Sequence, residues 1–100
     1  MSDKIIITPD PDLLDLIPNY LKNRQVDIVE LKKAFEARDF QHIRSIGHSI
    51  KGSGAGYGFA GLTDIGSALE AAAKGGDGQA VQNSITEMEA YLADVQVVGL

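Results

Sequence analysis

The sequence predicts an all-α protein, built as an antiparallel four-helix bundle with a short leading helix and an extended N-terminal arm. Four stretches of the chain repeat apolar residues at spacings of three and four, and short polar or glycine-rich breaks separate them. With 100 residues, the chain is long enough for one domain with one modest core. We therefore expect an arm over residues 1–9 and a single helical domain over residues 10–100.

The beginning of the chain combines an apolar arm with signals that start a helix. Ile5–Ile7 is too short to form a sheet, so we expect it to lie extended along its neighbours. Asp10 can cap a short leading helix because proline follows at the first helical position. Pro18 is expected to interrupt or kink that helix. The next helix is predicted over about residues 19–37, with Arg24 carrying its charge to solvent at the edge of the apolar stripe.

Three more helices are predicted from apolar spacing and break residues. Asp39 can cap the first of them, and a glycine-rich break at residues 75–78 ends the second. The last is expected to run from about Gln79 to Val97 or Val98. The apolar stripes expected to face the core are Ile43, Ile46 and Ile50, then Leu62, Ile65, Leu69 and Ala72, and last Val81, Ile85, Met88, Leu92 and Val95.

Composition and charge exclude several classes of protein. Lys and Arg number 9 against 14 for Asp and Glu, a net charge of -5, so the basic surface needed to bind nucleic acid or an anionic membrane is missing. The absence of Cys excludes disulfides, thiol nucleophiles and zinc–thiolate sites. No apolar run near the N-terminus approaches the roughly 20 residues of a membrane span. We therefore expect a cytoplasmic protein that holds no metal.

His48 is the candidate functional residue, because the third helix turns it away from the core. At about 100° per residue it lies about 140° from Ile43, which places it in solvent. An exposed imidazole is largely neutral and nucleophilic at pH 7. Lys51 one turn later can steady a transferred phosphoryl group, and Gly52 leaves room for another protein's active site. The other residues expected on this docking surface are Arg44, Ser45 and Ala55.

Other patterns in the chain are given a structural interpretation. His42 lies about 120° from His48 around the helix, and a separation of six residues does not allow the two rings to share a metal ion. Residues 56–61 match G-x-G-x-x-G, but that motif binds dinucleotides only after a strand. Residues 51–53 resemble a phosphate-binding loop in scrambled order, so neither stretch indicates nucleotide binding.

The glycines and acidic residues near the candidate site have simpler expected roles. Gly47, Gly54 and Gly56 are expected to let helices pack closely, since glycine inside a helix otherwise costs about 1 kcal/mol relative to alanine. The Ser53 hydroxyl is expected to bond back to a helix carbonyl. The carboxylates of Asp64, Glu70, Glu87 and Glu89 show no pairing that indicates acid–base catalysis, and we expect them to form a solvated face.

Residues 48–58 resemble the H-x-x-K-G-S signature of histidine phosphotransfer (HPt) domains, which act in two-component phosphorelays. The stretch reads His-Ser-Ile-Lys-Gly-Ser-Gly-Ala-Gly-Tyr-Gly, and a helix ending in Leu69-Glu70 and a Gly-Asp break at residues 76–77 follow it. Residues 38–40 also resemble the family's turn before the histidine helix. The resemblance extends over about residues 12–97. The chain departs from it in its glycine density and in the added Tyr57-Gly58-Phe59.

The resemblance implies a four-helix bundle whose exposed histidine takes a phosphoryl group from the phospho-aspartate of one receiver domain and passes it to another. It makes His48 the phospho-acceptor through Nε2, Lys51 the stabilising cation and Gly52 the small residue needed for docking. The partner receiver or kinase supplies catalysis and the magnesium ion, so we expect a carrier without a cofactor of its own. Its expected partners are response-regulator receiver domains and a hybrid histidine kinase, and we expect a monomer.

Two alternatives remain open at this point. A helical adaptor would bind receivers or other helices without being phosphorylated, so its partner affinity would not depend on the histidine. An enzymatic or metal-binding bundle would need polar groups converging in a cavity.

Overall fold

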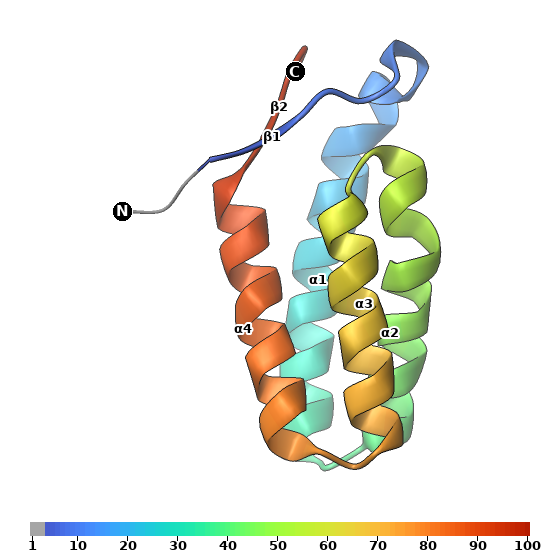
Figure 1. Cartoon of the computed structure of the whole chain (residues 1–100), viewed down its shortest axis with the longest axis vertical. Coiled ribbons are helices and arrows are strands. Elements are labelled where there is room, and N and C mark those ends of the chain that lie inside the picture. The colour runs from blue at the N-terminus through green and yellow to red at the C-terminus, as the bar shows by residue number, and fades with distance from the viewer. Residues whose placement is uncertain (1–3) are drawn as a thin grey trace.

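The computed structural model describes residues 4–100, which form four helices whose neighbours run antiparallel (Figure 1). The helices are α1 (Ile17–Glu36), α2 (Phe40–Gly54), α3 (Ala60–Lys74) and α4 (Gly78–Asp94). Two short 3₁₀ turns accompany them, η1 (Pro11–Leu16) before α1 and η2 (Ala55–Tyr57) after α2. The predicted all-α four-helix bundle is thus confirmed.

The predicted leading helix is present as the 3₁₀ turn η1. Its first turn is capped as expected, because the Asp10 carboxylate accepts a hydrogen bond from the Asp12 N–H at 2.9 Å. As expected, the leading turn gives way to the long helix near Pro18. The turn η1 ends at Leu16, and Pro18 lies in the first turn of α1, where the missing N–H of proline has no helical partner to lose.

The helix ends follow local signals in the sequence, and the cap predicted at Asp39 is confirmed. The Asp39 carboxylate accepts a hydrogen bond from the His42 N–H at 3.1 Å and begins α2. Asp77 does the same for the Ala80 N–H at the start of α4. Between them α3 ends at Lys74, and Gly76 takes a left-handed φ of 65°, a conformation that glycine adopts without strain.

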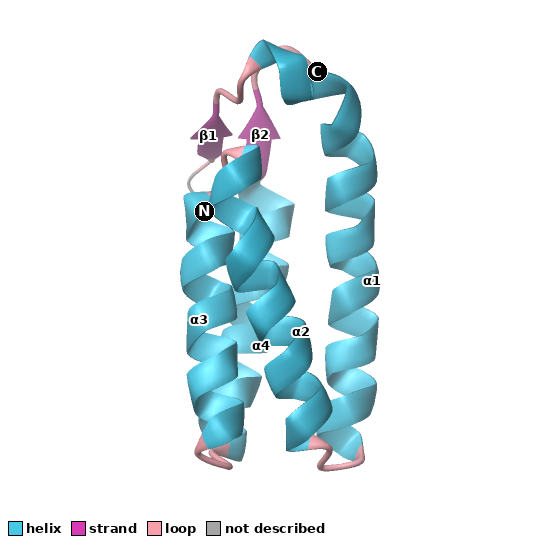
Figure 2. Cartoon of the chain, turned by 90° about the vertical axis from the view of Figure 1, so that its right-hand side faces the viewer, coloured by secondary structure: helices cyan, strands magenta, loops and turns pink. Residues whose placement is uncertain are grey.

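The C-terminal segment differs from the prediction, because α4 ends at Asp94 and does not continue to Val97 or Val98. Residues Val95–Val97 form a strand, β2, that pairs in parallel with β1 (Ile5–Ile7) at one end of the bundle (Figure 2). The Val98 N–H extends the pairing by donating to the Ile7 carbonyl at 2.8 Å. Both segments are rich in β-branched residues, and the end of the bundle buries one side of each. Residues 5–7 of the arm are therefore half of a two-stranded sheet, contrary to our expectation, and residues 1–3 of the predicted arm lie outside the described part of the chain.

The core contains most of the predicted apolar stripes. Met88 is fully buried as expected, whereas Ile46 and Leu92 are only half-buried at the margin. Phe59 is fully buried although it lies in the glycine-rich stretch, outside the helical stripes. The fully buried large side chains are Phe59, Ile17, Leu31, Ile43, Ile50, Leu62, Leu69, Met88 and Val81.

Gly47 of α2 and Gly66 of α3 let these two helices approach so closely that their backbones touch. A Cβ on Gly47 would lie 2.9 Å from the Glu70 nitrogen and 3.0 Å from the Gly66 carbonyl oxygen. A Cβ on Gly66 would meet the Gly47 carbonyl oxygen at 2.7 Å. The packing role predicted for Gly47 is confirmed, and the crossing fixes the register of α3 against α2.

Arg24 is largely buried at the margin of the bundle, contrary to the expectation that its side chain extends to solvent. Its guanidinium stacks 4.5 Å from the centre of the Tyr20 ring, its Nε lies 2.8 Å from the Asp27 carboxylate, and 13% of the side chain is exposed. Burial raises the pKa of Asp27, and the nearby Arg24 only partly opposes this. The cation satisfies both an aromatic face and a carboxylate, which makes the interior position more favourable than an isolated buried charge.

The added Tyr57-Gly58-Phe59 packs on the same aromatic cluster. The Tyr57 and Phe59 rings stack on Tyr20 with centroids 4.2 Å and 5.7 Å away. Ser53 joins this cluster through its hydroxyl, which lies 2.9 Å from the Tyr20 hydroxyl and 3.5 Å from the Ile50 carbonyl oxygen. The predicted bond to a helix carbonyl is present, but the contact with Tyr20 ties the end of α2 to α1.

Candidate functional site

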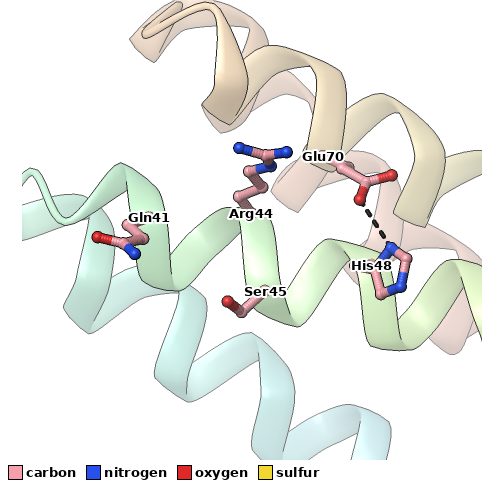
Figure 3. Close-up of a pocket in the computed structure, with 5 residues that line it drawn as sticks. All are labelled: Gln41, Arg44, Ser45, His48 and Glu70. Carbon is pink, nitrogen blue, oxygen red and sulfur yellow. Dashed lines mark hydrogen bonds and ion pairs between the residues drawn. The ribbon is translucent and has the colours of Figure 1, made fainter.

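His48 projects into solvent from the middle of α2, as its helical position predicts. Its side chain is 74% exposed, and its Nδ1 lies 2.8 Å from Oε2 of Glu70 on α3 (Figure 3). Lys51, one turn further along α2, places Nζ 3.4 Å from the other oxygen of the same carboxylate. Glu70 therefore holds both the histidine and the cation that the sequence singles out.

The hydrogen bond between His48 and Glu70 determines which imidazole nitrogen is free. The pKa of Glu70 is lowered from 4.5, first by the hydrogen bond from His48 and also by Lys51, while partial burial acts in the opposite direction. The carboxylate is thus ionised at neutral pH and can only accept hydrogen bonds. Nδ1 must carry the proton, so the neutral ring presents its lone pair on Nε2 to solvent. This is the arrangement that a nucleophilic imidazole requires.

An open hollow beside His48 is lined by side chains from α2 and α3. Its volume is about 400 Å³, and Gln41, Arg44, Ser45, His48 and Glu70 line it. Arg44 extends towards α3 and Ser45 points away from it, so the two residues border the histidine on different sides (Figure 3). Both side chains are exposed, as the sequence predicts for a docking surface.

Gly52 lies beyond the hollow on α2, and Ala55 begins the 3₁₀ turn η2 that follows this helix. Both are exposed, and among the described residues no heavy atom of another segment would lie within 4 Å of a Cβ on Gly52. The helix surface beside Lys51 is thus bare backbone, which permits close approach of another molecule. Gly56 is equally open, so its predicted packing role is wrong.

Glu70 is the site residue that the sequence interpretation misses, because the sequence alone places its carboxylate on a solvated acidic face. Its position follows from the glycine crossing: Gly66 lies one turn before Glu70, and Gly47 immediately precedes His48. The two glycines at these offsets are the only signal of this contact that the sequence offers. The sequence does not show that the two helices pair there, because spacing within a helix does not give the register between helices.

His42, the second histidine, lies outside this cluster. Its Nε2 is 3.8 Å from the Glu30 carboxylate of α1, and about half of its side chain is exposed. Across residues 4–100, no group of three or more His, Asp or Glu side chains gathers in a way that could hold a metal ion. None of the helices in that part of the chain is both long and apolar enough to cross a bilayer.

The role of Glu70 can be tested with Glu70→Gln. The amide oxygen of glutamine is a weaker acceptor than a carboxylate, so the preference of the imidazole for the Nδ1–H form is weakened, and we expect the ring nitrogen NMR signals of His48 to move towards the Nε2–H form. Because folding lowers the pKa of Glu70, its contribution to stability is present at pH 7 and is lost as the pH falls below 4.5 through that lowered pKa. Urea unfolding of wild type and variant should therefore differ at pH 7 and converge in acid.

Glu89→Gln is the matched control, since it removes a carboxylate of α4 that binds Lys32 of α1 at 2.9 Å, away from His48. We expect it to leave the His48 signals unchanged. Unchanged His48 signals in Glu70→Gln would contradict the assignment of the Nδ1 proton.

Comparison with known proteins agrees with the sequence resemblance. The Hpt domain family matches residues 11–97, which is nearly the whole chain. A search of curated proteins and a search of solved structures each found no match. The match spans all four helices and includes His48, Lys51 and Glu70. The chain therefore belongs to the Hpt domain family, the phosphocarrier modules of two-component signalling systems.

Proposed function

We propose that the protein accepts a phosphoryl group on Nε2 of His48 from the phospho-aspartate of one receiver domain and passes it to the aspartate of another. The observation that carries this proposal is the exposed imidazole whose Nδ1–H is held by the Glu70 carboxylate at 2.8 Å. It leaves a nucleophilic nitrogen pointing outward with no need for proton removal before attack.

The transfer balances without a further reactant. The Nε2 lone pair of His48 attacks the phosphorus atom, the N–P bond forms, and the bond between phosphorus and the aspartate oxygen breaks, with the carboxylate as leaving group. The Nδ1 proton stays on the ring, so the phosphorylated ring is cationic. Glu70 lies in place to stabilise that charge. The reverse sequence of bond changes delivers the group to the next receiver.

Lys51 and the surrounding surface serve the transferring phosphoryl group and the docking partner. The Lys51 ammonium lies on the same carboxylate as the imidazole, near enough to follow the phosphoryl group as negative charge arrives. The bare backbone at Gly52 admits the receiver, and the proposed contacts around it are Arg44, Ser45 and Ala55. The receiver contributes the magnesium ion and the catalytic groups, so this chain acts as a monomeric carrier and not as an enzyme. Because receivers are cytoplasmic modules, the proposal places the transfer in the cytoplasm.

The proposal is tested by phosphotransfer profiling. The protein is mixed with a panel of receiver domains that have been phosphorylated with radiolabelled acetyl phosphate in the presence of magnesium. We expect at least one receiver to lose its label to the protein within seconds to minutes and the new label to be labile in acid and stable in alkali. Stable complexes with receivers but no transferred label would instead favour the adaptor. The absence of both label and complex would overturn the carrier and the adaptor alike.

A further inference from the structure

The Thr63 hydroxyl of α3 is inserted into the backbone hydrogen bonding of α2. Its Oγ1 donates to the Lys51 carbonyl oxygen at 3.0 Å and accepts from the Ala55 N–H at 2.8 Å. In a continuous α-helix, the carbonyl of one residue accepts directly from the N–H four residues later. The hydroxyl therefore bridges the two backbone groups that such a bond would join.

The insertion coincides with the end of the α-helical part of this segment. Helix α2 ends at Gly54, and Ala55–Tyr57 continue as the 3₁₀ turn η2. A side chain that enters the hydrogen-bond ladder of a helix bends or ends it. Thr63 thus marks the point at which the chain leaves the helix that carries His48.

Gly54 makes this contact possible. A Cβ on Gly54 would lie 2.7 Å from the Thr63 nitrogen and 2.8 Å from its hydroxyl oxygen, too close for any residue but glycine. The packing role predicted for Gly54 is confirmed, and its purpose is specific, because it admits a hydroxyl to the backbone of the neighbouring helix. The signal in the sequence is a glycine three residues after Lys51 with a threonine nine residues later, but only the structure joins them.

The residues on either side of the bridge belong to the proposed phosphotransfer surface. The bridge runs from the backbone of Lys51, the proposed cation, to the backbone of Ala55, a proposed docking residue. Gly52 lies between these two ends and is bare towards solvent. Any change in the path of this turn moves the docking surface relative to the His48 ring, which is held separately by Glu70.

We propose that Thr63 is a positioning residue for phosphotransfer, which fixes the end of α2 where a receiver domain docks. The inference rests on the proposed function of His48 and adds a residue that touches neither the phosphoryl group nor the imidazole. Loss of the hydroxyl allows the Lys51 carbonyl and the Ala55 N–H to bond directly, which tightens the turn and shifts the surface that faces the receiver. The effect falls on recognition of the receiver and not on the reactivity of His48.

The test compares Thr63→Val, which keeps the shape and removes the hydroxyl, with Thr63→Ser, which keeps the hydroxyl. Initial rates of phosphotransfer are measured against the concentration of a phosphorylated receiver identified by the profiling above. We expect Thr63→Val to raise the half-saturating receiver concentration about fivefold, the equivalent of ~1 kcal/mol for one net hydrogen bond. Thr63→Ser should restore the half-saturating concentration to within about twofold of wild type.

Two further measurements separate positioning from damage. Phosphoramidate, a small phosphoryl donor that needs no docking surface, should label His48 equally in wild type and Thr63→Val. Thr86→Val is the matched control, because the Thr86 hydroxyl donates to the Gln82 carbonyl at 3.1 Å on the outside of α4. It should leave the half-saturating receiver concentration unchanged.

The outcomes distinguish this inference from the function on which it rests. Equal half-saturating concentrations for wild type and Thr63→Val, with wild type active, overturn the positioning role alone. An equal rise of the half-saturating receiver concentration in Thr63→Val and Thr63→Ser also overturns it. Slower labelling of Thr63→Val by phosphoramidate does the same, because both results indicate general damage to the fold. A wild-type protein that takes no label from any receiver overturns the proposed function and this inference together.

Discussion

Protein carrying His48→Gln takes up no phosphoryl label from any receiver that labels the wild type. The amide nitrogen of glutamine is far less basic and nucleophilic than an imidazole nitrogen and cannot form the N–P bond. We therefore expect complete loss of phosphoryl transfer and not a reduced rate. Because the His48 side chain is 74% exposed, its replacement should leave the fold intact. The measurement is transfer of radiolabel from a phosphorylated receiver, with circular dichroism on the same samples.

His42→Gln is the matched control for this experiment. It removes the other imidazole from the same helix, where the ring lies half-exposed and 3.8 Å from Glu30. We expect this variant to accept label at the wild-type rate. Label that survives His48→Gln, or disappears in His42→Gln alone, would show that the acceptor has been assigned to the wrong residue.

Gly66→Ala should destabilise the bundle by about 3 kcal/mol, at the upper end of the usual cost of overpacking. The new Cβ would meet the Gly47 carbonyl oxygen at 2.7 Å and the Lys51 Cα at 2.9 Å. These atoms belong to backbone and cannot rotate away, so α2 and α3 must separate. Separation also withdraws Glu70 from His48. Urea unfolding measures the first effect, and the His48 ring nitrogen signals measure the second.

Gly52→Ala provides the contrast, since the same methyl group would meet no heavy atom of another segment within 4 Å in the described part of the chain. There alanine should stabilise the helix by up to about 1 kcal/mol through its higher helix propensity. Equal stabilities for Gly66→Ala and wild type would contradict the close crossing of α2 and α3. A Gly52→Ala variant as unstable as Gly66→Ala would show that Gly52 is structurally required.

Local signals in the sequence were sufficient for most of the helical architecture. Asp39 and Asp77 cap helices through their own carboxylates, and such caps depend on residues only three positions apart. The exposure of His48 follows from its angle to the buried Ile43 and Ile50 on the same helix. These features depend on the geometry of one segment of chain, so its sequence predicts them.

Features that join distant segments were predicted poorly. The strand at Val95–Val97 continues the apolar spacing of α4, and only its pairing with Ile5–Ile7 makes the extended form the better one. The expectation that Arg24 extends to solvent is wrong because its contact with the Tyr20 ring arises only from the folded arrangement of the side chains. In each case a contact made across the fold outweighed the local preference.

What the sequence by itself determined is the helical bundle, the outward-facing His48 and the family resemblance of the segment that contains it. Only the tertiary structure decided that Glu70 holds the imidazole and that Thr63 enters the backbone of α2. The physical reason is that spacing within a helix specifies which residues share its faces, whereas the register between helices depends on packing. Here that register is set where Gly47 and Gly66 bring two backbones into contact.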